Sequence, residues 1–247
     1  MSKLTRDNVI TILARQRNLA QADLSRLNLS ELDFRGVDLR DADLSYAVLV
    51  NGDLRQANLS RARLLGANFS YANLMAVTLV DANLLNAKFY RVQMQRGQLI
   101  GAIGHYVNFI QAELDGAFLT RADLESAYLI RTQLPKASLT DARLVLANLT
   151  GANLTLADLS RCNLTYANLT QTSLADARCT GARFHGANLS ETVATGINLR
   201  GANLTRARIV DANFAYADLS GADFTGASIA HTNFTQATLD GVIGLDV

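Results

Sequence analysis

The sequence predicts an all-β solenoid, because large apolar residues recur at every fifth position along almost the whole chain. From Leu19 to Leu239 the 45 positions of this register hold Leu or Phe 39 times, and no insertion shifts the phase. Two residues earlier in each repeat, from Ala22 to Ala237, Ala occupies 30 of 44 positions. On an α-helix this spacing wanders around the surface, and on a straight strand it alternates between faces. We therefore expect the chain itself to turn at each A-(N/D)-(L/F)-x-x unit, with the first and third residues pointing inward.

The segment before the repeats predicts a short α-helix over residues 5–17. The stretch TRDNVITILARQRN places Val9, Ile12 and Leu13 on one helical face, and Thr5 stands where an N-cap is expected. A β-helix leaves an unpaired strand edge at each end, so we expect this helix to cap the first coil. Membrane binding is the alternative, but the apolar stretch is short and rich in polar residues.

The tandem units resemble the pentapeptide repeat family over about nine tenths of the chain. This resemblance implies a right-handed quadrilateral parallel β-helix of about eleven coils with four pentads each. Independent support for four pentads comes from residues that stack at a spacing of 20. Phe69, Phe89 and Phe109 have this spacing, and outward Asp and Arg alternate in one column from Asp41 to Arg161.

A single domain is expected over residues 1–247, with the capping helix at 5–17, repeats at 18–241 and a C-terminal tail at 242–247. The final stretch TLDGVIGLDV offers no second capping helix. The C-terminal coil edge is covered either by these residues or by a second subunit. A homodimer through that edge is therefore one expected assembly.

One stretch interrupts the repeat, at residues 91–109. Gly104 removes a core side chain, Ile103 stands where Asn or Asp is expected, and Gly97 replaces an inward Ala. We predict a local bulge or bend of the rod there. A lesser irregularity is expected over residues 193–197.

Charge composition separates two functions that a regular rod could have. Some members of the resembled family protect type II topoisomerases by imitating duplex DNA with strongly negative surfaces, which makes a DNA mimic that binds DNA gyrase or topoisomerase the alternative function. This chain has 23 Lys and Arg against 22 Asp and Glu, so its net charge of +1 disfavours mimicry. Nucleic-acid binding is not expected either. Arg35 and Arg55 adjoin in one column, which we interpret as a solvated face.

No residue pattern predicts catalysis, a cofactor or a metal site. His105 and His185 lie in one column of stacked residues but four coils apart, and His231 lies in another column. The three histidines are therefore separated, and the pattern does not place a catalytic base beside a nucleophile. Cys162 and Cys179 take inward positions without a CxxC motif, which favours two reduced core thiols over a disulfide or a metal site. Phosphate-binding loops and dinucleotide fingerprints are not found. We therefore expect a non-enzymatic protein. Because the sequence shows no export signal and no membrane span, we expect it to be cytoplasmic.

The outward positions provide one candidate site, a concentration of Tyr and aliphatic residues on one side of the rod. Such residues on a surface suggest a contact site for an unidentified protein partner, and no membrane is expected to take part. The alternative is a β-surface whose residues stack well between strands. We call this set the tyrosine side, and it consists of Tyr46, Leu65, Tyr71, Leu85, Tyr90, Tyr106, Ile110, Tyr128, Ile130, Leu146 and Tyr166.

The functional expectation is a scaffold or protein-protein interaction module. The Ala-rich repeats, and the N-terminal helix that runs into RNLAQADL, most resemble pentapeptide proteins of cyanobacteria. One of those proteins regulates cell differentiation through protein contacts. The resemblance implies this class of mechanism and identifies no partner.

Overall fold

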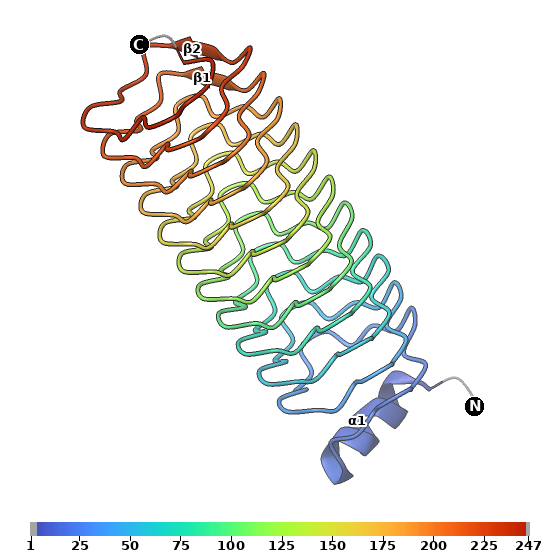
Figure 1. Cartoon of the computed structure of the whole chain (residues 1–247). Helices are drawn as coiled ribbons and strands as arrows, with labels where there is room; N and C mark the ends of the chain where they lie inside the picture. The colour runs from blue at the N-terminus through green and yellow to red at the C-terminus, as the bar shows by residue number, and fades with distance from the viewer. Residues whose placement is uncertain (1–3, 246–247) are drawn as a thin grey trace.

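The chain winds into a right-handed quadrilateral β-helix in the computed structural model, which describes residues 4–245 (Figure 1). Each repeat forms one side, and the residue before each central Leu or Phe pairs in parallel with the residue 20 positions later, as Asn28 does with Val48. This offset confirms four repeats per coil. Most pairings are single bridges, but β1 (Arg208–Val210) and β2 (Ser228–Ala230) form a longer parallel pair.

The corners explain which residues occupy the last position of each repeat. That residue takes a left-handed backbone conformation, for example with φ of 56° at Arg61 and 57° at Tyr106. β-branched side chains adopt this region least readily. Among the described repeats the position holds Gly and many polar residues but no Val, Ile or Thr. The preceding corner position does accept them, as Val80 and Ile110 show.

The core is the continuous ladder that the five-residue period predicts. The central Leu and Phe side chains are fully buried through most coils, together with the Ala two positions earlier. The rings of Phe69 and Phe89 stack with centroids 5.0 Å apart, and those of Phe89 and Phe109 stack at 5.1 Å. Each such burial contributes on the order of 2 kcal/mol, so the stacked coils together offset the entropy of ordering the chain.

The predicted bulge or bend at residues 91–109 is wrong, because the coils pass through this segment in regular register. The Gly104 amide donates to the Asp123 carbonyl at 2.7 Å, as the core Leu residues do in other coils. The Gly97 amide donates to the Met94 carbonyl at 3.0 Å. The backbone therefore shows no interruption where the side chains depart from the repeat.

Neighbouring side chains fill the space that the two glycines leave. A Cβ built on Gly104 would lie 3.1 Å from Val107 Cγ1, and one built on Gly97 would lie 2.8 Å from Met94 Cγ. Val107 is larger than the Ala that the repeat usually has at its position, and the flexible Met94 side chain takes the place of a Leu or Phe next to Gly97. Close packing is restored by this exchange of volume, so the backbone does not need to move.

The lesser irregularity predicted at residues 193–197 is also wrong, for the same reason. Ala194 replaces a central Leu, and Ile197 replaces the Ala three positions later. Both are fully buried, and the Ile197 amide still donates to the Ala194 carbonyl at 3.2 Å.

The N-terminal end is closed as predicted by α1 (Arg6–Arg15), which lies against the first coil (Figure 1). Thr5 is the N-cap and forms a capping box with Asn8, and Val9 is completely buried. The Arg6 guanidinium donates to the carbonyl oxygens of Asn28 at 2.7 Å and Ser30 at 3.0 Å. In later coils the equivalent carbonyls accept from the preceding coil, so Arg6 supplies the donors that the first coil lacks.

The C-terminal end has no comparable cover among residues 4–245. The inward residues Ile229, Phe234 and Leu239 of the last coil are only partly buried. The last coil's final ladder bond joins the Ile243 amide to the Ala222 carbonyl at 3.0 Å. Residues 246–247 of the predicted tail lie outside the described residues.

Candidate protein-binding surface

The tyrosine side is one side of the quadrilateral together with the two corners that flank it. Tyr128 lies on the side itself, where it pairs with Asn108 and Asn148, and the other members lie at the corners. Six members have side chains about half exposed, with exposed fractions from 45% to 55%: Tyr46, Tyr71, Tyr106, Tyr128, Leu146 and Tyr166. The remaining five are partly buried between coils: Leu65, Leu85, Tyr90, Ile110 and Ile130.

Two of the tyrosines form a local cluster that stabilises the corner. The rings of Tyr71 and Tyr90 meet edge to face with centroids 5.5 Å apart, and the Arg91 guanidinium lies 5.3 Å from the Tyr90 centroid. The Tyr90 hydroxyl donates to Gln111 Oε1 at 3.2 Å. Stacking between coils accounts for these rings without a partner.

Two further tyrosines cover a glycine of the next coil. A Cβ on Gly66 would lie 2.8 Å from Tyr46 Cδ1, and a Cβ on Gly186 would collide with the Tyr166 ring. The Tyr46 ring also lies 5.2 Å below the Arg26 guanidinium. Each glycine therefore leaves the space in which a tyrosine ring packs on the backbone.

Tyr106, Tyr128 and Leu146 are different, because stacking does not account for them. Among residues 4–245 neither tyrosine has a ring partner or a hydrogen-bonded hydroxyl. Tyr106 and Leu146 also occupy left-handed corners, with φ of 57° and 59°. Large side chains there are strained by about 1 kcal/mol or more. These three residues are the exposed members of the tyrosine side whose presence stacking between coils does not explain.

The charged residues on the tyrosine side are mainly positive. Between residues 46 and 171, the side and the outermost corner positions hold Lys88, Arg91 and Arg131 but no Asp or Glu. Other sides alternate charges and pair them: Arg61 Nε lies 2.8 Å from Asp41 Oδ1, as the alternating column predicts. The tyrosine side therefore combines exposed aromatic surface with cations that make no ion pair among the described residues, since Glu125 at the flanking corner is paired with Arg143.

The rim of the tyrosine side holds a cluster that the sequence analysis missed. His105 Nε2 lies 2.9 Å from Asp123 Oδ2, and Arg143 Nη1 binds both Asp123 Oδ1, at 3.1 Å, and Glu125 Oε2. Burial opposes ionisation of Asp123, but the hydrogen bonds from His105 and Arg143 outweigh it and hold its pKa below the usual value. His, Asp and Glu are metal-ligand types, yet here a guanidinium occupies the carboxylates. The cluster is an ion-pair network whose signal in the sequence is the spacing of 18 and 20 residues.

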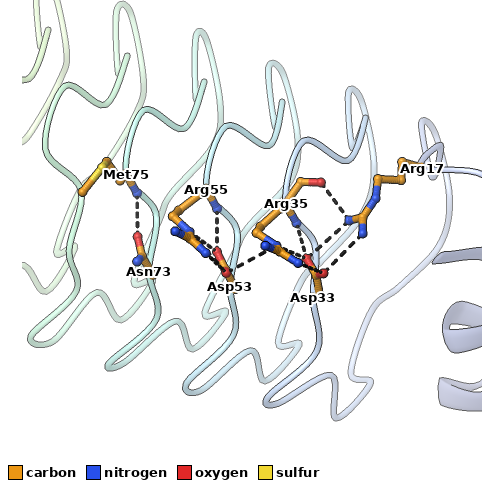
Figure 2. Close-up of polar contacts among 7 residues, drawn as sticks. All are labelled: Arg17, Asp33, Arg35, Asp53, Arg55, Asn73 and Met75. Atoms are coloured by element: carbon orange, nitrogen blue, oxygen red, sulfur yellow. Dashed lines mark hydrogen bonds and ion pairs between the residues drawn. The ribbon is translucent and has the colours of Figure 1, made fainter. Parts of the chain in front are cut away.

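A second ion-pair network follows the side next to the tyrosine side (Figure 2). Arg35 Nη2 lies 2.7 Å from Asp33 Oδ2, and Arg55 Nη2 lies 2.6 Å from Asp53 Oδ2. Arg17 adds a contact of 3.2 Å to Asp33. Hydrogen bonding by Arg35 holds the pKa of Asp33 well below its usual range, and hydrogen bonding by Arg55 lowers that of Asp53. The sequence suggested a solvated face for the column of Arg35 and Arg55. In the structure these arginines form an ordered ladder of ion pairs with Asp33 and Asp53.

The cysteines are placed as expected, because Cys162 and Cys179 are fully buried free thiols. Burial raises the pKa of both thiols above the usual value, so neither forms the thiolate that a nucleophile or metal ligand requires. Within residues 4–245, no helix has the length and apolar character needed to cross a bilayer.

Comparison with known proteins gives a consistent result for the repeat. The family model described as pentapeptide repeats (8 copies) matches over seven ranges, at residues 15–41, 38–75, 67–103, 105–141, 142–178, 177–214 and 207–243. Comparison with curated protein sequences gives no match.

Similar solved structures include HetL, a pentapeptide repeat protein involved in heterocyst differentiation regulation from the cyanobacterium Nostoc sp. strain PCC 7120. HetL is 27% identical, the match covers 97% of this chain and 99% of HetL, and the TM-score is 0.55. Full-length QnrB1, a plasmid-mediated fluoroquinolone resistance protein, is 16% identical over 81% of this chain and 92% of its own, with a TM-score of 0.29. Rfr23 from the cyanobacterium Cyanothece 51142 is 19% identical over 92% and 98%, with a TM-score of 0.22.

Proposed function

Because this chain belongs to the pentapeptide repeat family, we propose that it is a non-enzymatic scaffold that binds a protein partner along the tyrosine side. One observation carries the proposal: from residue 46 to residue 171 this face exposes Tyr and Leu beside three cations, and its one acidic residue, Glu125, is paired with Arg143. Protein interfaces are enriched in Tyr and Arg and are most apolar at their centre. The partner is expected to present apolar side chains flanked by carboxylates.

The conformation of Tyr106 and Leu146 supports the proposal. At left-handed corners Gly or Asn would be less strained, so stability alone does not favour a large side chain there. Inter-coil stacking explains Tyr71 and Tyr90, but Tyr106 has no ring partner among the described residues. Tyr106 and Leu146 differ from other exposed corner residues, such as Tyr216, because they share one face with Tyr128, and a role in binding accounts for this grouping.

The likeness to HetL supports a regulatory role of this kind. That protein takes part in heterocyst differentiation regulation, and the match covers nearly the whole of both chains. We propose that this protein acts by holding another protein and that it carries out no chemistry of its own.

The experiment compares two positions that share a backbone conformation. Tyr216 is also a left-handed corner tyrosine, with φ of 61° and 61% exposed, but it lies at a corner outside the tyrosine side. A photo-cross-linking amino acid placed at Tyr106 should give a discrete adduct in cells of the source organism, and the same group at Tyr216 should give none. The double variant Tyr106→Asn and Leu146→Asn should reduce recovery of that partner at least tenfold. Equal adducts at both positions, or none at Tyr106, would refute the proposal.

A gyrase-directed DNA mimic is the alternative, and purified protein tests it directly. A mimic requires a negative rod, whereas this chain has a net charge of +1 and pairs many of its carboxylates with arginines. We expect no inhibition of gyrase supercoiling at micromolar protein. Inhibition that a neutralising variant such as Asp141→Asn relieves would favour mimicry instead.

Two further features complete the proposal. A cytoplasmic location is supported by the two buried, unpaired thiols, since disulfides form mainly in oxidising compartments. A homodimer through the C-terminal coil edge is supported by the partly exposed Ile229 and Phe234 of the last coil. Light scattering should then give twice the chain mass of 26.7 kDa, and Phe234→Asp should return it to a single chain.

A further inference from the structure

The ladder of Arg17, Asp33, Arg35, Asp53 and Arg55 follows a simple rule in its first coils (Figure 2). Arg35 and Arg55 each bind the carboxylate two residues before them, as Arg35 Nε does with Asp33 Oδ1 at 3.0 Å, and Arg17 adds a contact to Asp33 from the neighbouring coil. Arg35 also faces the next carboxylate along the rod, with 3.6 Å between its Nε and Asp53 Oδ2. A guanidinium in this ladder therefore lies between two carboxylates.

The rule fails after Arg55. In the next coil Asn73 stands in the carboxylate column and Met75 in the arginine column. Asn73 Oδ1 still accepts a hydrogen bond from the Met75 amide at 3.2 Å, so the turn is kept while the charge is lost. Arg55 thus has a carboxylate on one side only, at the place where Figure 2 shows the ladder ending.

A surface cavity of about 270 Å³ lies at this interruption, lined by Arg35, Arg55, Gln56, Met75 and Ala76. The Nη1 groups of both arginines make no hydrogen bond to residues 4–245, because the contacts of each use Nε and Nη2. The Met75 side chain is 43% exposed and provides an apolar wall.

The charge balance at the cavity is positive. The ladder has three guanidinium groups and two carboxylates, which leaves one positive charge. Arg96 follows one coil beyond Ala76 in the same column, and it has no ion pair within the described part of the chain. A single carboxylate from another molecule would neutralise the one excess positive charge of the ladder. It would take the place that an Asp side chain occupies in earlier coils.

We propose that this cavity binds the side-chain carboxylate of an acidic polypeptide segment, with Arg55 as the principal donor and Met75 as the apolar contact. Arg35 and Arg55 pair with Asp33 and Asp53 through Nε and Nη2, which leaves the Nη1 group of Arg55 to donate to a carboxylate from outside. The cavity lies at a corner that does not adjoin the tyrosine side. Binding here is therefore independent of the proposed function, and either can fail without the other.

The test uses two of the three methionines of the chain, Met75 and Met94, as probe and reference. With methyl-¹³C methionine, the exposed Met75 signal reports on the cavity and the fully buried Met94 signal is an internal reference. Titration with the blocked peptide Ac-Gly-Glu-Leu-Gly-NH₂ at low salt should shift Met75 and leave Met94 unchanged. The same peptide with Gln in place of Glu should bind at least tenfold more weakly.

Two variants separate this site from general charge effects. Asn73→Asp supplies the missing carboxylate from the protein itself and should weaken peptide binding at least tenfold, as should Arg55→Gln. Asn153→Asp adds the same charge on the same side four coils away and should leave binding unchanged. Equal shifts with the Gln peptide, unchanged binding by Asn73→Asp, or tighter saturation by inorganic phosphate than by the Glu peptide would each overturn the proposal.

Discussion

The exchange of volume between Gly104 and Val107 can be tested by restoring the regular repeat at both positions. Val107→Ala removes two buried methyl groups, which lowers the free energy of unfolding by about 1.6 kcal/mol of transfer and by about 1 kcal/mol for the cavity. Gly104→Leu alone is also destabilising, by about 1–3 kcal/mol, because its Cβ would lie 3.1 Å from Val107 Cγ1 and 2.9 Å from Leu124 Cδ2. Gly104 does not take a left-handed conformation, so the backbone admits a side chain there.

The double variant Gly104→Leu and Val107→Ala reproduces the arrangement found in the regular coils. Its stability should be within about 1 kcal/mol of the parent chain, although the single effects sum to about 4–6 kcal/mol. The coupling free energy is then about 3 kcal/mol, at the upper end for residues in contact. Urea denaturation followed by circular dichroism gives the midpoints and slopes. A double variant whose loss equals the sum of the two single losses would show that the residues do not share one space.

Three other predictions concern the ends, the ladder and the core. Arg6→Gln should lower the free energy of unfolding by about 1–2 kcal/mol, because two first-coil carbonyls lose their donor; Arg15→Gln is the matched control, and equal losses would contradict this role. Hydrogen bonding by Arg35 depresses the pKa of Asp33 in the folded state. The ionised Asp33 therefore contributes fully to the free energy of unfolding above its unfolded pKa of about 4, and this contribution is lost as pH falls through the folded pKa. Urea midpoints of Asp33→Asn should therefore fall less steeply below pH 4 than those of the parent, and parallel slopes would contradict the assignment. The two buried thiols should resist iodoacetamide at pH 8 in the native chain and react fully in denaturant, whereas rapid native alkylation would show that the core opens.

The fold could be predicted because every repeat has the same pattern of inward and outward residues. Leu154, Leu159 and Leu164 are buried on successive sides of one coil, as their spacing predicts, and Phe69 stacks on Phe89 as their 20-residue separation predicts. The N-cap at Thr5 followed from local chemistry in the same way. Errors arose where a single residue departed from the repeat, at Gly104, because its compensation depends on how neighbouring volumes fit together in three dimensions.

The candidate sites could be predicted less fully. The columns placed the tyrosine side correctly, but they could not separate Tyr71, whose ring is supported by Tyr90, from Tyr106, whose ring has no partner among the described residues. Side-chain rotamers across a corner decide that difference, and the repeat leaves them free. The Arg143 network was missed for the same reason, because its members meet only across adjacent coils.

The sequence by itself determined that this protein is a solenoid, since a period of five requires the chain to turn in order to bury its Leu and Phe residues, and the 20-residue spacing of stacked residues supported four repeats per coil. Tertiary structure alone decided which outward side chains are paired and which remain available. Asp33 and Asp53 are occupied by arginines, whereas Arg55 faces a cavity because Asn73 stands where a third carboxylate would be. Burial is set by a pattern that repeats along the chain, but surface contacts depend on the particular residues that stacking brings within a few ångströms of one another.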